Sequence, residues 1–120
     1  MDDTDATGVG GDDRDRPVSV GSREAFERLV AAEPLVLVAF VTPGCGICAS
    51  MEPVLGAVAR AAPGVVAVVD ASEVPEPARE FDVRAAPTLV VLRDGAEVER
   101  LDEGFYGAER LVETLTAHAP

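Results

Sequence analysis

The sequence feature that most constrains the fold is an unbroken apolar run, Leu35 to Val41, followed at once by a turn and a helical pattern. Because the run does not alternate between apolar and polar residues, it predicts a strand buried on both faces, as inside a parallel sheet. Residues 42–44, Thr-Pro-Gly, predict a sharp turn. A helix is then expected to begin at or just after Cys45, because apolar residues recur at helical spacing: Ile47, Met51, Val54, Leu55 and Val58.

The chain's two cysteines, Cys45 and Cys48, therefore lie at the start of this helix and at the carboxyl end of a central strand. Free backbone N–H groups and the positive end of the helix dipole favour a thiolate at such a position. We expect a lowered pKa and the role of nucleophile for Cys45. Cys48, three residues later on the same helix face, is expected to lie deeper and to resolve a mixed disulfide formed by Cys45. A Cys-x-x-Cys pair close to a βαβ pattern is a known redox motif.

Metal binding and inert buried thiols are the alternatives for this cysteine pair. A structural zinc site normally needs four ligands, but the chain has no second cysteine pair and only one histidine, His118, near its end. A zinc or iron-sulfur site would thus need a dimer. We expect no metal and no cofactor, with the Cys45–Cys48 disulfide as the redox centre, and we assign His118 no role.

Composition restricts the partners and the setting of the protein. The chain has 120 residues, enough for one domain, and no apolar run approaches the roughly 20 residues that span a bilayer. The N-terminus has neither a basic nor an apolar signal region, so we expect a cytoplasmic protein. Asp and Glu number 22 against 10 basic residues, all of them Arg, and the net charge of -12 disfavours binding to nucleic acid or to anionic membranes.

The same charge predicts strong self-repulsion at low salt, which favours a halophile whose salt-rich cytoplasm screens the charges. An acidic protein from a GC-rich genome, which also favours Arg over Lys, is the alternative. The charged surface opposes self-association, and we expect a monomer.

Patterns along the chain predict an acidic, disordered tail at residues 1–16 and a single domain at residues 17–120. Before the central strand, the domain is expected to contain a short edge strand at Val18–Val20 and a helix capped by Ser22 and ending near Glu33. After the cysteine helix, which contains Pro53, a strand at 65–69 and a short helix at 73–81 are expected. The chain then continues with strands at 88–92 and 96–101 joined by an Asp94-Gly95 hairpin, a loop at 104–107 and a helix at 108–117.

This order of elements, with Cys-Gly-Ile-Cys after the first interior strand, resembles the thioredoxin family, an α/β fold with a central mixed β-sheet flanked by helices. Residues 83–88, Val-Arg-Ala-Ala-Pro-Thr, resemble the family segment that contains a cis-proline. The resemblance implies a cis bond at Ala86–Pro87, with the proline against the disulfide and the preceding backbone pairing with substrate. The residues that it implies at the substrate surface are Gly44, Gly46, Ile47, Ala86, Pro87 and Gly104.

Three positions depart from the family pattern. Gly44 stands where thioredoxins usually have tryptophan, and Ile47 where they have proline. Ala39 replaces the buried aspartate six residues before the first cysteine, to which proton transfer with the second cysteine is usually assigned. Family members with other residues between the cysteines range from reductants to oxidants, so Ile47 leaves the redox potential open.

The cysteine pair and the resemblance together predict a thiol-disulfide oxidoreductase that reduces protein disulfides. The resemblance also implies that the protein is itself reduced by a donor similar to thioredoxin reductase. A disulfide oxidant or isomerase, a glutaredoxin-like protein and a non-catalytic binding module with this fold are the alternatives. Phe105 and Tyr106 are expected either to rim the substrate surface or to pack against the last helix.

Overall fold

The computed structural model describes residues 15–120. Its elements follow the predicted order, with ends that differ from the predicted ones by no more than two residues: β2 (Val18–Val20), α2 (Arg23–Ala32), β3 (Leu35–Val41), α3 (Gly46–Ala61), β4 (Val65–Asp70), α4 (Pro75–Glu80), β5 (Thr88–Arg93), β6 (Ala96–Leu101) and α5 (Ala108–Ala117). Residues 1–14 of the predicted tail lie outside the described residues, and the tail stays a prediction.

The five strands form one mixed sheet in the order β2-β4-β3-β5-β6, with β3 at its centre. Strand β3 pairs parallel to β4, with Val38 opposite Ala67, and antiparallel to β5, with Val38 opposite Val90. Because β3 and β4 are parallel, α3 must cross from the end of one strand to the start of the other. The cysteines therefore lie at the carboxyl end of the central strand.

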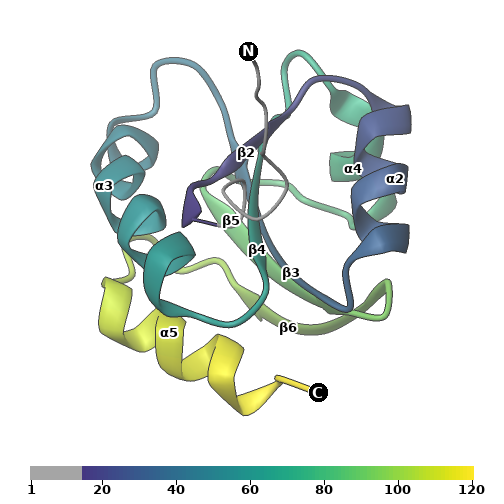
Figure 1. The fold of residues 1–120 in the computed structure, drawn as a ribbon. Coiled ribbons are helices and arrows are strands. Elements are labelled where there is room, and N and C mark those ends of the chain that lie inside the picture. The colour runs from purple at the N-terminus through teal and green to yellow at the C-terminus, as the bar shows by residue number, and fades with distance from the viewer. Residues whose placement is uncertain (1–14) are drawn as a thin grey trace, which may run out of the picture.

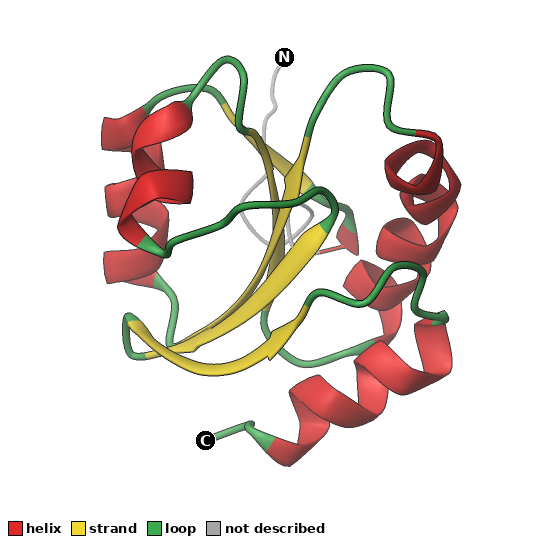
Figure 2. Ribbon diagram, turned by 180° about the vertical axis from the view of Figure 1, so that it is seen from behind, coloured by secondary structure: helices red, strands yellow, loops and turns green. Residues whose placement is uncertain are grey.

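Side chains of β3 alternate between two apolar cores, which is why the strand has no polar face. Leu37 and Ala39 lie in a core that also contains residues of α3 and α5, while Val38 and Phe40 lie in one that contains residues of α2 and α4. All four side chains are at most 1% exposed. Figure 1 shows the two pairs of helices on opposite sides of the sheet, and Figure 2 shows the same layers from behind.

Local sequence accounts for several of the element ends. The Ser22 side chain accepts a hydrogen bond from the Ala25 N–H at 3.1 Å, which caps α2 as expected. The β5–β6 hairpin turns at Asp94 and Gly95, whose φ angles of 52° and 84° are those of the turn that best joins twisted antiparallel strands. Helix α3 continues across Pro53 to Ala61.

Arg100, on β6, connects the sheet to the turn after α4 through hydrogen bonds. Its guanidinium donates hydrogen bonds to the Phe81 and Asp82 carbonyls and pairs with Glu97 at 2.8 Å. Hydrogen bonding between the two side chains lowers the pKa of Glu97 and raises the pKa of Arg100. These contacts hold the start of the segment that leads into Ala86 and Pro87.

Candidate active site

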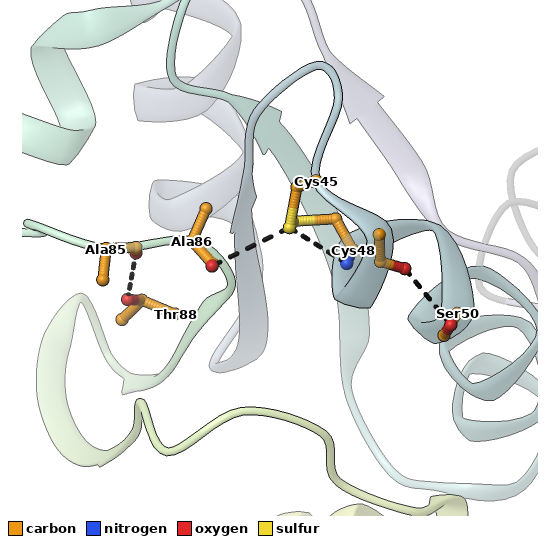
Figure 3. Close-up of a disulfide and its surroundings, with 7 residues drawn as sticks. Cys45, Cys48, Ser50, Ala85, Ala86 and Thr88 are labelled. Atoms are coloured by element: carbon orange, nitrogen blue, oxygen red, sulfur yellow. Dashed lines mark hydrogen bonds between the residues drawn. A yellow bond between two sulfur atoms is a disulfide. The ribbon is translucent and has the colours of Figure 1, made fainter.

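The two cysteines form a disulfide at the N-terminus of α3 (Figure 3). Cys45 is the N-cap residue of the helix, and its Sγ accepts a hydrogen bond from the Cys48 backbone N–H at 3.1 Å. Cys48 is 6% exposed, whereas Cys45 is half-buried. Cys48 is thus the deeper of the two, as the helix register predicted.

The segment before β5 lies opposite the disulfide. The Ala86–Pro87 bond is cis, as the resemblance implied. The Ala86 carbonyl oxygen lies 3.8 Å from the Cys45 Sγ, and Figure 3 shows it pointing toward that sulfur. The buried Thr88 hydroxyl donates a hydrogen bond to the Ala85 carbonyl at 2.6 Å, which fixes the backbone around Pro87.

Glycines shape the turn that leads into the cysteines. Gly44 has a φ of +77°, which favours glycine at that position, and both Gly44 and Gly46 are exposed. An added Cβ would meet no atom within 4 Å at either residue. The approach to Cys45 from this side is therefore open.

Ile47 is 44% exposed, so it does not extend the buried apolar face of α3 that its helical spacing predicted. It lies in the first turn of the helix, where its side chain projects beyond the core. Gly104 follows β6 by three residues, and Leu101 at the end of β6 is opposite Leu89 of β5. Gly104 is therefore at the same end of the sheet as Pro87.

Of the two aromatic residues that follow Gly104, one is packed and the other is exposed. Tyr106 packs against the core beneath α5, and its hydroxyl accepts a hydrogen bond from the Glu103 N–H at 2.9 Å. Phe105 is 55% exposed. His118, to which we assigned no role, lies 2.8 Å from Glu99 of β6 and joins the end of the chain to the sheet.

A cavity of about 470 Å³ opens beside the disulfide between the β3–α3 loop, the first turns of α3, the start of β2 and the end of β4. Both cysteines line it, and so do two carboxylates, Glu52 and Asp70. Sequence reasoning missed these carboxylates. The spacing of four residues between Cys48 and Glu52 puts them on one helix face and was the available signal.

Asp70 ends β4 opposite the end of β3, and Ser72 holds its carboxylate in place. The Ser72 hydroxyl and backbone N–H donate hydrogen bonds to Asp70 Oδ1 at 2.6 and 2.9 Å. These two bonds lower the pKa of Asp70, so it stays ionised well into the acidic range.

Comparison with known proteins agrees with this geometry. The family model described as Thioredoxin matches residues 17–117. The chain belongs to the thioredoxin family. It is 37% identical over 102 residues to thioredoxin of Chlamydia trachomatis, covering 84% of this chain and 98% of that protein. It is 36% identical over 99 residues to thioredoxin H-type 1 of Nicotiana tabacum, covering 80% of this chain and 75% of that protein.

Among solved structures, a single-residue mutant of thioredoxin from Halobacterium salinarum superposes with a TM-score of 0.84 at 27% identity, covering 94% of this chain and 97% of that one. The thioredoxin of Fasciola hepatica superposes with a TM-score of 0.75 at 32% identity, covering 85% of this chain and 99% of that one.

Family membership and the disulfide-bonded cysteine pair identify the chain as a thiol-disulfide oxidoreductase. Thioredoxins act on protein disulfides, are reduced by thioredoxin reductase and need no cofactor, because the cysteine pair is itself the redox centre. Within residues 15–120, no group of three or more His, Cys, Asp or Glu side chains is arranged so that it could hold a metal ion. No helix in this part of the chain is long and apolar enough to cross a membrane.

Proposed function

We propose that Cys45 is the nucleophile that attacks substrate disulfides and that Cys48 resolves the mixed disulfide. The hydrogen bond from the Cys48 N–H to the Cys45 Sγ carries this assignment, because the same donor would stabilise a Cys45 thiolate after reduction. The difference in burial supports it as well. Cys45 is the more accessible sulfur, and only Cys45 needs to meet a protein substrate.

The proposed cycle conserves electrons and protons. The Cys45 thiolate attacks one sulfur of the substrate disulfide, and the other substrate sulfur leaves as a thiolate and takes up a proton. Cys48 then loses its proton and attacks Cys45. This step forms the Cys45–Cys48 disulfide and releases the second substrate thiol. A donor dithiol of the thioredoxin reductase class returns the pair to its reduced form.

The substrate surface that we propose surrounds Cys45. The Ala86 backbone, held between Pro87 and the Thr88 hydroxyl bond, is available for pairing with an extended substrate chain. Exposed Gly44, Gly46 and Ile47 belong to this surface, and so does Gly104, which lies at the same end of the sheet as Pro87. Because Gly44 and Gly46 have no side chains, this surface leaves room for bulky substrate residues.

A redox titration tests the proposed direction of electron flow. We expect the Cys45–Cys48 pair, equilibrated with dithiothreitol buffers and followed by alkylation mass shift, to have a potential below about -220 mV, in the range of cytosolic reductants. A value near about -120 mV would instead make the protein an oxidant. If no intramolecular disulfide forms at all, the redox cycle itself is wrong.

We also propose that the protein works as a monomer in the salt-rich cytoplasm of a halophile, with residues 17–120 as the working domain and residues 1–16 as a solvated acidic tail. The net charge of -12 and the complete absence of Lys support this setting. Molar salt shortens the Debye length to about 3 Å and so removes most of the repulsion between surface carboxylates.

Thermal unfolding measures this effect directly. Between 20 mM and 2 M KCl we expect the unfolding midpoint of the oxidised protein to rise by about 5 to 10 °C, because screening stabilises the compact, highly charged state. KCl is preferable to a sulfate salt, which would also strengthen apolar burial. A midpoint that stays constant or falls with KCl would contradict the proposal.

A further inference from the structure

The resolving step requires that Cys48 lose a proton, yet Cys48 is 6% exposed. Thiolates attack disulfides and thiols do not, so the rate of this step depends on a route for the proton. The core offers no ionisable acceptor among residues 15–120. Ala39 is fully buried, and the buried polar side chains of this part of the chain are Thr88 and Thr114, neither of which is a carboxylate or an imidazole.

The cavity beside the disulfide provides this route. Cys48 forms part of its wall, and its volume of about 470 Å³ is large enough for several water molecules. Among the described residues, the titratable groups that line it are the two cysteines, Glu52 from α3 and Asp70 from β4. No arginine or histidine of residues 15–120 lines it, so no fixed positive charge competes for these carboxylates.

The two carboxylates differ in their suitability as bases. Asp70 Oδ1 already accepts two hydrogen bonds from Ser72, which stabilise its ionised form and weaken it as a proton acceptor. Glu52 lies one helical turn after Cys48, on the same face of α3, and is exposed at the cavity mouth. It can therefore take a proton from inside the cavity and pass it to solvent.

We propose that Glu52 accepts the Cys48 proton, through water in this cavity, during resolution of the mixed disulfide. The proton moves from Cys48 Sγ to water while that water gives a proton to the Glu52 carboxylate. The Cys48 thiolate then attacks Cys45 Sγ, and the bond between Cys45 and the substrate sulfur breaks. The substrate leaves with the electron pair of that bond. This inference rests on the proposed roles of Cys45 and Cys48.

Single-turnover oxidation by 4,4′-dithiodipyridine separates the two chemical steps. This neutral disulfide releases one thiopyridone when Cys45 attacks it and a second when Cys48 resolves the product. In Glu52→Gln we expect the second release to be about tenfold slower at pH 6 to 7. This is less than the 10²- to 10⁴-fold typical of a base in direct contact, because the transfer runs through water. The two proteins should converge at alkaline pH, where Cys48 ionises unaided.

Whether the second release becomes slower or faster in Glu52→Gln distinguishes a proton acceptor from a nearby negative charge. If Glu52 acts only as a nearby negative charge, its removal favours the Cys48 thiolate and makes the second release faster. A faster or unchanged second release in Glu52→Gln would therefore overturn the proposal. Glu113→Gln, exposed on α5, is the control and should stay within about twofold of the parent. Asp70→Asn removes a charge from the same cavity without removing the proposed acceptor, so its second release should not be slower. A tenfold loss in Asp70→Asn instead would move the role to Asp70.

The same traces show separately whether the proposed roles of the cysteines hold. If the parent protein releases no second thiopyridone, or if Cys45→Ser still shows both releases, the assignment of nucleophile and resolver fails whatever Glu52 does. If the parent shows both releases but the second release in Glu52→Gln is faster or unchanged, the cysteine roles are correct and Glu52 is not the proton acceptor.

Discussion

A Cys45→Ser variant will lose catalysis of protein-disulfide reduction entirely. A serine hydroxyl keeps its proton at neutral pH, so the hydrogen bond from the Cys48 N–H would have no anionic sulfur to stabilise. In an insulin reduction assay with dithiothreitol as the donor, the rate should fall to that of dithiothreitol alone. The buried Cys48 thiol is not expected to substitute, since it is 6% exposed. Turnover clearly above the background would contradict the assignment of Cys45.

Cys48→Ser should behave differently, because it retains the attacking thiolate and lacks only the resolver. We expect this variant to accumulate mixed disulfides through Cys45 under oxidising conditions, visible as dithiothreitol-sensitive adducts in non-reducing gels and by mass spectrometry. The double variant, with Cys45→Ser added, is the matched control and should form none. Equal trapping by both proteins would mean that the adducts do not arise from the proposed cycle.

The secondary structure near the site could be predicted because each signal there is local. The unbroken run at β3 indicated a strand with two apolar faces, and the structure divides its side chains between two cores. Ser22 and the pair Asp94 and Gly95 end their elements through contacts or φ angles that depend on one or two residues. The depth of Cys48 followed from helix register alone.

Contacts between segments distant in sequence could not be predicted in this way. Nothing in the local pattern indicates that Arg100 reaches the Phe81 carbonyl or that His118 meets Glu99. The cavity at the disulfide could not be predicted either, because its wall combines α3 with the ends of β2 and β4, which are distant in sequence. Ile47 fits the helical apolar pattern, but it precedes the part of α3 that packs on the sheet and is therefore exposed.

Ala39→Asp is expected to give a large, pH-dependent loss of stability. Ala39 is fully buried in an apolar core, so the new carboxyl would be desolvated and its pKa raised in the native state. Below about pH 4 both states bind the proton and the loss is that of the neutral side chain. At higher pH the unfolded chain releases the proton first, so the free energy of unfolding falls by about 1.4 kcal/mol per pH unit up to the native pKa. By pH 8 the pH-dependent part of the loss in unfolding free energy should reach about 3 to 4 kcal/mol.

Urea unfolding of the oxidised protein at pH 4, 6 and 8 measures this dependence, and two variants separate its causes. Ala39→Asn has nearly the same shape without a titrating group, so its loss should be the same at every pH relative to the parent. Ala96→Asp puts the same charge on the exposed edge strand β6 and should change stability by about 0.5 kcal/mol or less. A loss in Ala39→Asp that does not grow with pH would mean that the carboxyl reaches water or a partner. In that case the core around residue 39 would be able to hold a buried acid.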